Sequence, residues 1–250
     1  MGGFKTTVIN EIEKMYKKKK MTVILIISVA VIAIGKLISV GMSTVGVGVF
    51  KESTVFPISV LSVLANTLLP LFTTLVAIDL FSGEFSHNTI KITLTRPVSR
   101  FKLFSAKITA IAFFVLLNLL AVMILSTIVG FICNFSSITF IGIIRIIISY
   151  IVTLIPIMIL ALAVVFLSNI LKSGSAVFFL SIMLYIISYA MGKIFSQYSI
   201  LLITSMLDWH VHWVSDIMLV TKILREFLTM LGYGIIFFTA GFYLFDKKDL

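Results

Sequence analysis

The residues with the clearest potential for chemistry lie in one short stretch, Asp208-Trp209-His210-Val211-His212. A carboxylate and two imidazoles could supply three ligands to a metal ion such as zinc. Alternate residues share a face only in an extended strand, however, and the stretch has no evident fourth ligand. We therefore predict no metal site here.

Other patterns that would indicate catalysis are absent from the sequence. It contains no H-E-x-x-H, no G-x-S-x-G and no Cys/His pairing near Cys133, which is the single cysteine. A G-x-x-x-x-G-K-[ST] phosphate-binding loop is also missing, so the chain cannot bind ATP by that device. We predict no catalytic residue and no cofactor on this chain, and any ATP that powers it must be bound by another polypeptide.

The composition shows which elements must position any functional residue. Of the 250 residues, 60% are hydrophobic and 12% are charged, and the mean hydropathy is +1.19. Soluble domains are about half apolar and a quarter charged, so this is an integral membrane protein. The formal net charge of +10 belongs in loops that face anionic lipid or a partner, because no folded basic face for nucleic acid is evident.

Six apolar runs are long enough to cross a bilayer, which takes about 20 residues in a helix. They are Met21 to Val40, Phe56 to Leu80, Ile108 to Ile132, Ile146 to Leu171, Ser175 to Ile194 and Phe227 to Phe245. Lys36, Asp79 and Lys193 stand near span ends, where charged groups can reach the headgroups. We expect one all-α membrane domain over residues 21–250, preceded by a separate segment, 1–20.

The basic residues predict the orientation of these spans. Fourteen of the 20 lysines and arginines fall on the side of the two termini and six on the other. By the positive-inside rule both termini are cytoplasmic. The segment 196–226 is then extracytoplasmic, and Trp209 and Trp213, four residues apart, favour a short helix at the outer interface.

The first twenty residues have the pattern of an amphipathic helix on the inner leaflet. Apolar side chains recur there at helical spacing, at Phe4, Val8, Ile12 and Met15. The charged side chains, Lys5, Glu11, Glu13 and Lys14, are expected on the other face. Lys17 to Lys20 would bind anionic headgroups at the elbow before the first span. A flexible basic tail is the alternative, and the absence of a cleavage pattern argues against a signal peptide.

Polar residues and prolines inside the spans are few. Asn66 and Asn118 could meet a substrate or form a hydrogen bond with a neighbouring helix. Pro70 and Pro156 each remove a backbone donor and favour a kink. No ionisable residue stands in mid-span, which argues against a proton-coupled or sodium-coupled carrier.

The longest cytoplasmic connection, Phe81 to Lys107, is the most informative loop. It contains five cations and one acid, together with Ile90, Ile92 and Leu94, which have no reason to face water. A segment that has apolar residues among charges is suited to dock on a soluble partner. A basic loop lying on lipid is the alternative.

This loop resembles the cytoplasmic signature of ABC-2 type permeases, the membrane subunits of ATP-binding-cassette exporters. The similarity lies in Glu84, Asn88-Thr89-Ile90-Lys91 and Leu94-Thr95-Arg96-Pro97-Val98-Ser99-Arg100, and in the ending Phe245-Asp246-Lys247-Lys248-Asp249-Leu250. The family usually has glycine where Asn88 stands. Asparagine also tolerates left-handed backbone geometry, so the turn can survive.

The resemblance implies a type II ABC exporter fold with six spans and an interfacial N-terminal helix. It implies dimerisation with a second copy or a sister permease, and two separate ATPase subunits that bind ATP and magnesium. The coupling segment, 82–107, would press on the ATPase through Glu84, Asn88, Thr89, Ile90, Lys91, Leu94, Arg96, Pro97 and Arg100. The permease itself would do no covalent chemistry.

The cargo implied is hydrophobic or amphipathic, in the first place an antimicrobial or toxin peptide exported across a bacterial plasma membrane. An interior of Phe, Ile, Leu and Met suits such a cargo. Sodium, drugs and lipid-linked glycans are alternatives within the family. A membrane sensor or assembly protein would share the composition without needing a docking loop, and a membrane enzyme would require a polar constellation, for example around His210 or His212.

Overall fold

The computed structural model describes residues 3–44, 54–83, 99–133, 139–171, 173–215 and 219–247, and their regular structure is helical throughout. Most of the predicted coupling segment, residues 84–98, lies outside these ranges. The helices are α1 (Phe4–Tyr16), α2 (Lys19–Thr44), α3 (Val55–Asn66), α4 (Leu68–Leu80), α7 (Arg100–Cys133), α8 (Phe140–Ile170), α9 (Gly174–Ile194), the 3₁₀ helix η2 (Ser196–Leu201), α10 (Ile203–Met206), α11 (Trp209–Val214) and α12 (Val220–Asp246).

Five of the described helices are long and apolar enough to cross a membrane: α2, α7, α8, α9 and α12. The pair α3 and α4 passes the same test together but is bent by 46° at its break. The described residues therefore contain five candidate spans, or six if the bent pair is one broken span. The predicted spans overlap these helices, although α7, α8 and α12 begin eight, six and seven residues before the predicted Ile108, Ile146 and Phe227.

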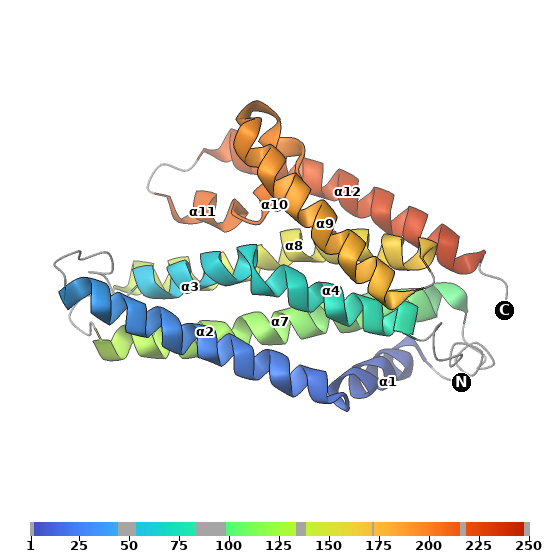
Figure 1. Ribbon diagram of the computed structural model, residues 1–250, viewed down its shortest axis with the longest axis horizontal. Helices are drawn as coiled ribbons and strands as arrows, with labels where there is room; N and C mark the ends of the chain where they lie inside the picture. The colour runs from blue at the N-terminus through green and yellow to red at the C-terminus, as the bar shows by residue number, and fades with distance from the viewer. Residues whose placement is uncertain are drawn as a thin grey trace.

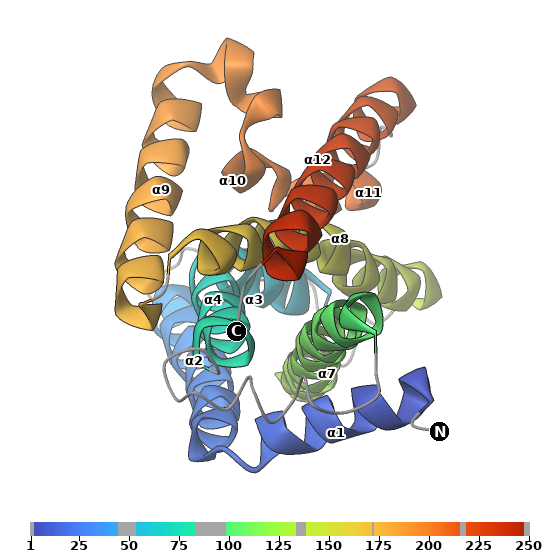
Figure 2. The ribbon, with the colours of Figure 1, turned by 90° about the vertical axis from the view of Figure 1, so that its right-hand side faces the viewer.

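The helices α2, α3, α4, α7 and α8 run side by side along the long axis of the molecule, while α9 and α12 cross them at a slant (Figure 1). The start of α1, the end of α4, the start of α7 and the end of α12 lie at one end, which we call the loop end (Figure 1). Viewed from that end, α1 lies across the bundle beside α2 and α7 (Figure 2). Helix α8 is the central element and packs on α4, α7, α11 and α12.

An aromatic cluster closes the loop end. Phe81, which caps α4, meets Phe104 of α7 at a ring-centroid distance of 5.6 Å and Phe245 of α12 at 6.0 Å. All three side chains are buried, and Phe238 and Phe242 of α12 pack against Phe104. Edge-to-face aromatic contacts add stabilisation to the area that they bury. The cluster thus joins the ends of three helices that are distant in sequence.

A buried tyrosine joins three spans near the opposite end. The hydroxyl of Tyr150 in α8 donates to the carbonyl oxygen of Pro57 in α3 at 3.0 Å and lies 3.0 Å from the Ser126 hydroxyl of α7. Hydroxyls inside a membrane bundle need such partners because lipid supplies none. This contact fixes α3, α7 and α8 relative to one another.

The two prolines behave differently. Pro70 is the third residue of α4 and follows the break at Thr67, so the predicted kink in this span is confirmed. Proline has no N–H to donate to the carbonyl four residues earlier, here that of Asn66, and its ring crowds that carbonyl. Pro156 lies inside α8, and the helix continues through it without interruption.

The segment between α9 and α12 returns to the bundle instead of resting outside it. The predicted short helix is present as α11, but Trp209 is only 2% exposed and stacks on Phe227 of α12 at a centroid distance of 6.0 Å. Neighbouring side chains, Met206, Leu207 and His210, are also buried. Trp209 therefore packs in an apolar cluster with Ile159 of α8 and Met230 of α12, and the position of α11 at the outer membrane interface stays a prediction.

Candidate functional site

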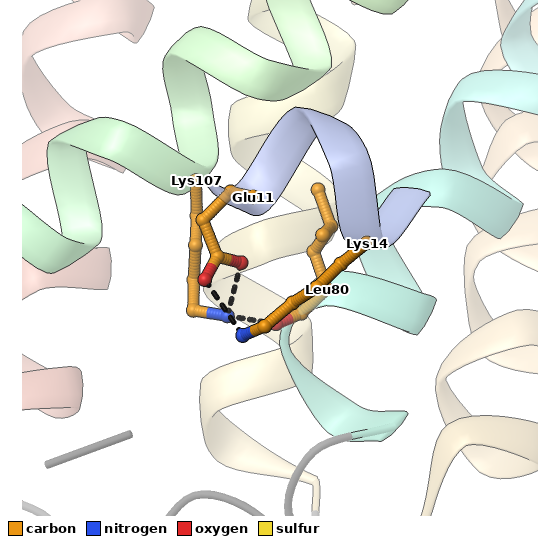
Figure 3. A network of polar contacts seen from close by, with 4 residues as sticks. All are labelled: Glu11, Lys14, Leu80 and Lys107. Carbon is orange, nitrogen blue, oxygen red and sulfur yellow. Dashed lines mark hydrogen bonds and ion pairs between the residues drawn. The ribbon is translucent and has the colours of Figure 1, made fainter. Parts of the chain in front are cut away.

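The main polar site at the loop end is a charge cluster formed by Glu11, Lys14 and Lys107 (Figure 3). The ammonium of Lys107 in α7 lies 3.2 Å from a carboxylate oxygen of Glu11 in α1, and it donates to the carbonyl oxygen of Leu80 at 2.8 Å. Lys14 contacts the other carboxylate oxygen of Glu11 at 2.8 Å. The side chains of Lys107 and Glu11 are 1% and 2% exposed.

This arrangement corrects the prediction for the N-terminal segment. Residues 4–16 are helical, as expected. Glu11, however, points into the bundle beside Met15, not outward with the other charges. The reason is the buried ammonium of Lys107, which offers the Glu11 carboxylate an ion pair inside the bundle. The position of α1 on the inner leaflet stays a prediction.

The electrostatic balance at Glu11 favours its charged form. Burial alone would raise the pKa of this carboxyl, but the charges of Lys107 and Lys14 and their hydrogen bonds together hold the pKa below its ordinary value. A second ion-pair group lies nearby, because Lys18 and Lys20 contact Asp79 at 3.5 Å and 3.0 Å. Two of the four elbow lysines that were predicted to bind lipid headgroups therefore have a protein partner in α4.

Of the predicted coupling residues, Arg100 is the one that the structure describes. It is the first residue of α7, and its Nη1 donates to the carbonyl oxygen of Asp246 at the end of α12. The start of α7 is thus tied to the last span. The remaining predicted residues, Glu84 and those between Asn88 and Pro97, lie outside the described ranges.

An apolar cavity of about 630 Å³ lies between α4, α8, α9, α10 and α12. None of the residues that line it is charged. Several of its polar groups are paired: Ser188 lies 3.0 Å from Thr204, and the Tyr233 hydroxyl donates to the Leu201 carbonyl at 2.7 Å. Within the described residues, Asn66 Oδ1 and Ser181 Oγ are buried without a hydrogen-bond partner. The volume is in the usual range of ligand pockets, and the wall suits an uncharged apolar group.

Asn66 lies on the wall of this cavity, at the break between α3 and α4. Its side-chain nitrogen donates to a carboxylate oxygen of Asp208 at 2.6 Å, and its backbone carbonyl oxygen accepts from the Tyr185 hydroxyl of α9 at 2.6 Å. The tyrosine therefore replaces the N–H that Pro70 lacks. Asn118 does not line the cavity. Its side-chain amide donates to the Ser28 hydroxyl of α2 at 3.4 Å.

The Asp208, His210 and His212 side chains turn to different partners. His210 is buried, with Nδ1 3.2 Å from the Leu207 carbonyl and Nε2 2.9 Å from the Ser62 hydroxyl. A carbonyl can only accept, so Nδ1 carries the proton, Nε2 accepts from Ser62, and the neutral ring is satisfied. Burial lowers the pKa of this imidazole. His212 lies 3.5 Å from Glu226.

Comparison with known families decides the class of protein. The family described as ABC-2 family transporter protein matches residues 7–192, well over half of the chain. The chain belongs to the ABC-2 transporter family. This permease is accordingly a multi-pass membrane subunit of an ABC exporter, which works with ABC ATPase subunits and is itself a transport component rather than a catalyst. No curated protein matches it.

The matched part of the permease includes the charge cluster and the break at Asn66, whereas α10, α11 and α12 follow it. Sequence reasoning missed Glu11 and Lys107 as partners, although a signal was present. Lys107 falls on the stripe of buried α7 residues that includes Leu103, Phe104, Ala110 and Ile111, and Glu11 stands between Val8 and Met15 on the apolar stripe of α1. A charge inside each of two apolar stripes indicates a buried pair.

We predict that the stability of the permease depends on pH through Glu11. Because the folded pKa is lowered, the stabilisation is complete above the ordinary value of 4.5 and is lost as the pH falls through the folded pKa. Thermal unfolding of the detergent-solubilised protein between pH 6 and pH 3 measures this loss. Glu11→Gln, which cannot ionise, should show a flatter profile, and equal slopes in the two proteins would contradict the prediction.

We also predict that Tyr185 and Pro70 are coupled energetically. Tyr185→Phe leaves the Asn66 carbonyl without a donor and should lower the free energy of unfolding by about 0.6–1.7 kcal/mol, the range for hydrogen bonds inside a membrane. In a Pro70→Ala background the new N–H can serve that carbonyl, so the same change should be nearly neutral. Tyr189→Phe, which alters an exposed ring one turn away, is the control. An identical loss in both backgrounds would exclude the coupling.

Proposed function

We propose that this permease forms the translocation path for a hydrophobic or amphipathic substrate, in the first place an antimicrobial or toxin peptide, across a bacterial plasma membrane. The observation that supports this proposal is the cavity of about 630 Å³, which no charged residue lines. An apolar cavity binds apolar groups and disfavours ions, which would leave their water shell without gaining new ligands. Sodium is therefore a poor candidate, because no carboxylate lines the wall.

We further propose that two ATPase subunits dock at the loop end and that two permease chains associate. The predicted coupling residues, Glu84 to Arg100, connect the end of α4 with the start of α7, and both helix ends lie at the loop end (Figure 1). This end also holds Lys18, Lys20 and Lys107. Its positive charge supports a cytoplasmic position.

The orientation can be tested by cysteine labelling in a Cys133→Ser background. Ser99→Cys at the loop end should react with a membrane-impermeant maleimide only from the cytoplasmic side. Val211→Cys, which is 45% exposed on α11, should react only from outside. The reverse pattern would overturn the topology and with it the docking proposal.

The docking residues can be tested with the cognate ATPase. Glu84→Ala or Arg96→Ala should leave the permease folded in the membrane but weaken ATPase copurification and ATP-dependent export of a labelled amphipathic peptide. Loss of one partner of a desolvated interfacial charge pair costs about 2–5 kcal/mol, whereas loss of a solvated charge costs little. Lys51→Ala, in the loop predicted to lie outside, is the control. Equal assembly and export in all three variants would refute the assignment.

A further inference from the structure

The charge cluster lies where the two helices that flank the coupling segment come together. Lys107 contacts α1 through Glu11 and α4 through Leu80, so one ammonium group bridges three helices (Figure 3). Leu80 is the last residue of α4, and its carbonyl has no donor within its own helix. A lysine at this place donates to that carbonyl, and its positive charge interacts favourably with the negative end of the helix dipole.

The immediate surroundings exclude water from this contact. The ring centroid of Phe81 is 5.8 Å from the Lys107 ammonium, and Phe104, one turn before Lys107, is fully buried. Glu11 is enclosed in the same way, and Lys14 closes the more exposed side. Burial of an ion pair gives little net stability over apolar residues of similar size. Stability alone therefore explains poorly why α1 and α7 meet through charges.

We propose that Glu11 and Lys107 are positioning residues for ATPase coupling: Lys107 fixes the end of α4 against α7, and Glu11 holds the ammonium in that place. This inference rests on the proposed docking role of the segment between these helices. An ammonium that donates to both the Glu11 carboxylate and the Leu80 carbonyl sets the separation and orientation of the helix ends, which apolar contacts leave adjustable. A segment whose two ends are fixed loses less freedom on binding, so the ATPase should bind it more tightly.

A paired substitution separates positioning from stability. Lys107→Met alone would leave Glu11 buried beside Lys14 only and is expected to impair folding. The double variant Glu11→Met with Lys107→Met removes both charges and keeps long apolar side chains. It should fold, yet it cannot donate to the Leu80 carbonyl. Lys107→Arg keeps the charge and the donors and should retain most of the function. Lys5→Met, an exposed change on α1, is the matched control.

The position of the helix ends can be measured directly. Spin labels at Gly83→Cys and Ser99→Cys, in a Cys133→Ser background, report the distance between the end of α4 and the start of α7. We expect a narrow distribution in the parent, the Lys107→Arg and the Lys5→Met proteins, and a broader one in the double variant. The affinity of the cognate ATPase for the full-length permease should fall roughly fivefold to tenfold in the double variant alone.

Each outcome decides the inference. A folded double variant with the parent distance distribution and ATPase affinity shows a purely structural pair and overturns it. If the double variant does not fold, Glu11→Gln replaces it as the test, because the glutamine keeps an acceptor for Lys107 but not the charge. The Glu11→Gln permease should bind the ATPase roughly twofold to threefold less tightly than the parent. An affinity equal to that of the parent would refute the inference. Failure of the parent permease itself to bind the ATPase would refute the proposed function instead.

Discussion

A polar group inside this bundle must find its partner in protein, because hydrocarbon offers none. The contacts between helices follow this constraint. The Asn66 carbonyl, which Pro70 cannot serve, accepts from Tyr185, and Tyr150 reaches the Pro57 carbonyl. The Leu80 carbonyl, at a helix end, accepts from Lys107. In each case a side chain of one helix satisfies the backbone of another, and these few directed bonds fix how otherwise similar apolar surfaces pack.

The three contacts differ in what they connect. Tyr150 joins α3, α7 and α8 and holds the spans together away from the loop end. Tyr185 joins the bent span to α9 on the wall of the cavity. Lys107 joins α1, α4 and α7 beneath the aromatic cluster. Directed contacts therefore occur at both ends of the bundle and also on the wall of the cavity, where the Tyr233 hydroxyl donates to the Leu201 carbonyl.

The spans could be predicted from the sequence because hydropathy is a local property. The charge-free runs coincide with α2, α7, α8, α9 and α12, and Pro70 correctly marked the bend. Partners could not be predicted in the same way. Glu11 and Lys107 are 96 residues apart, and only the folded bundle shows that two charges on apolar stripes face each other. The burial of Trp209 could not be predicted for the same reason, since it depends on α8 and α12.

Of the helices that meet at the charge cluster, α4 also forms a wall of the cavity, and α12 connects the aromatic cluster with the cavity. Helix α4 ends at Leu80 and lines the cavity at Pro70, Leu71 and Thr74. Leu80 and Pro70 are ten residues apart, which is about 15 Å along the helix. Helix α12 contributes Phe245 to the aromatic cluster and Tyr233 and Phe237 to the cavity. A helix of this length moves as a rod, so a displacement of its end at the cluster displaces its residues at the cavity. Since Arg100 and Lys107 bind the ends of α12 and α4 to α7, a force applied to the segment between α4 and α7 acts on both walls together. With the ATPase docked at this segment as proposed, motion would reach the cavity through the helices themselves, a route that requires no ionisable group in mid-membrane.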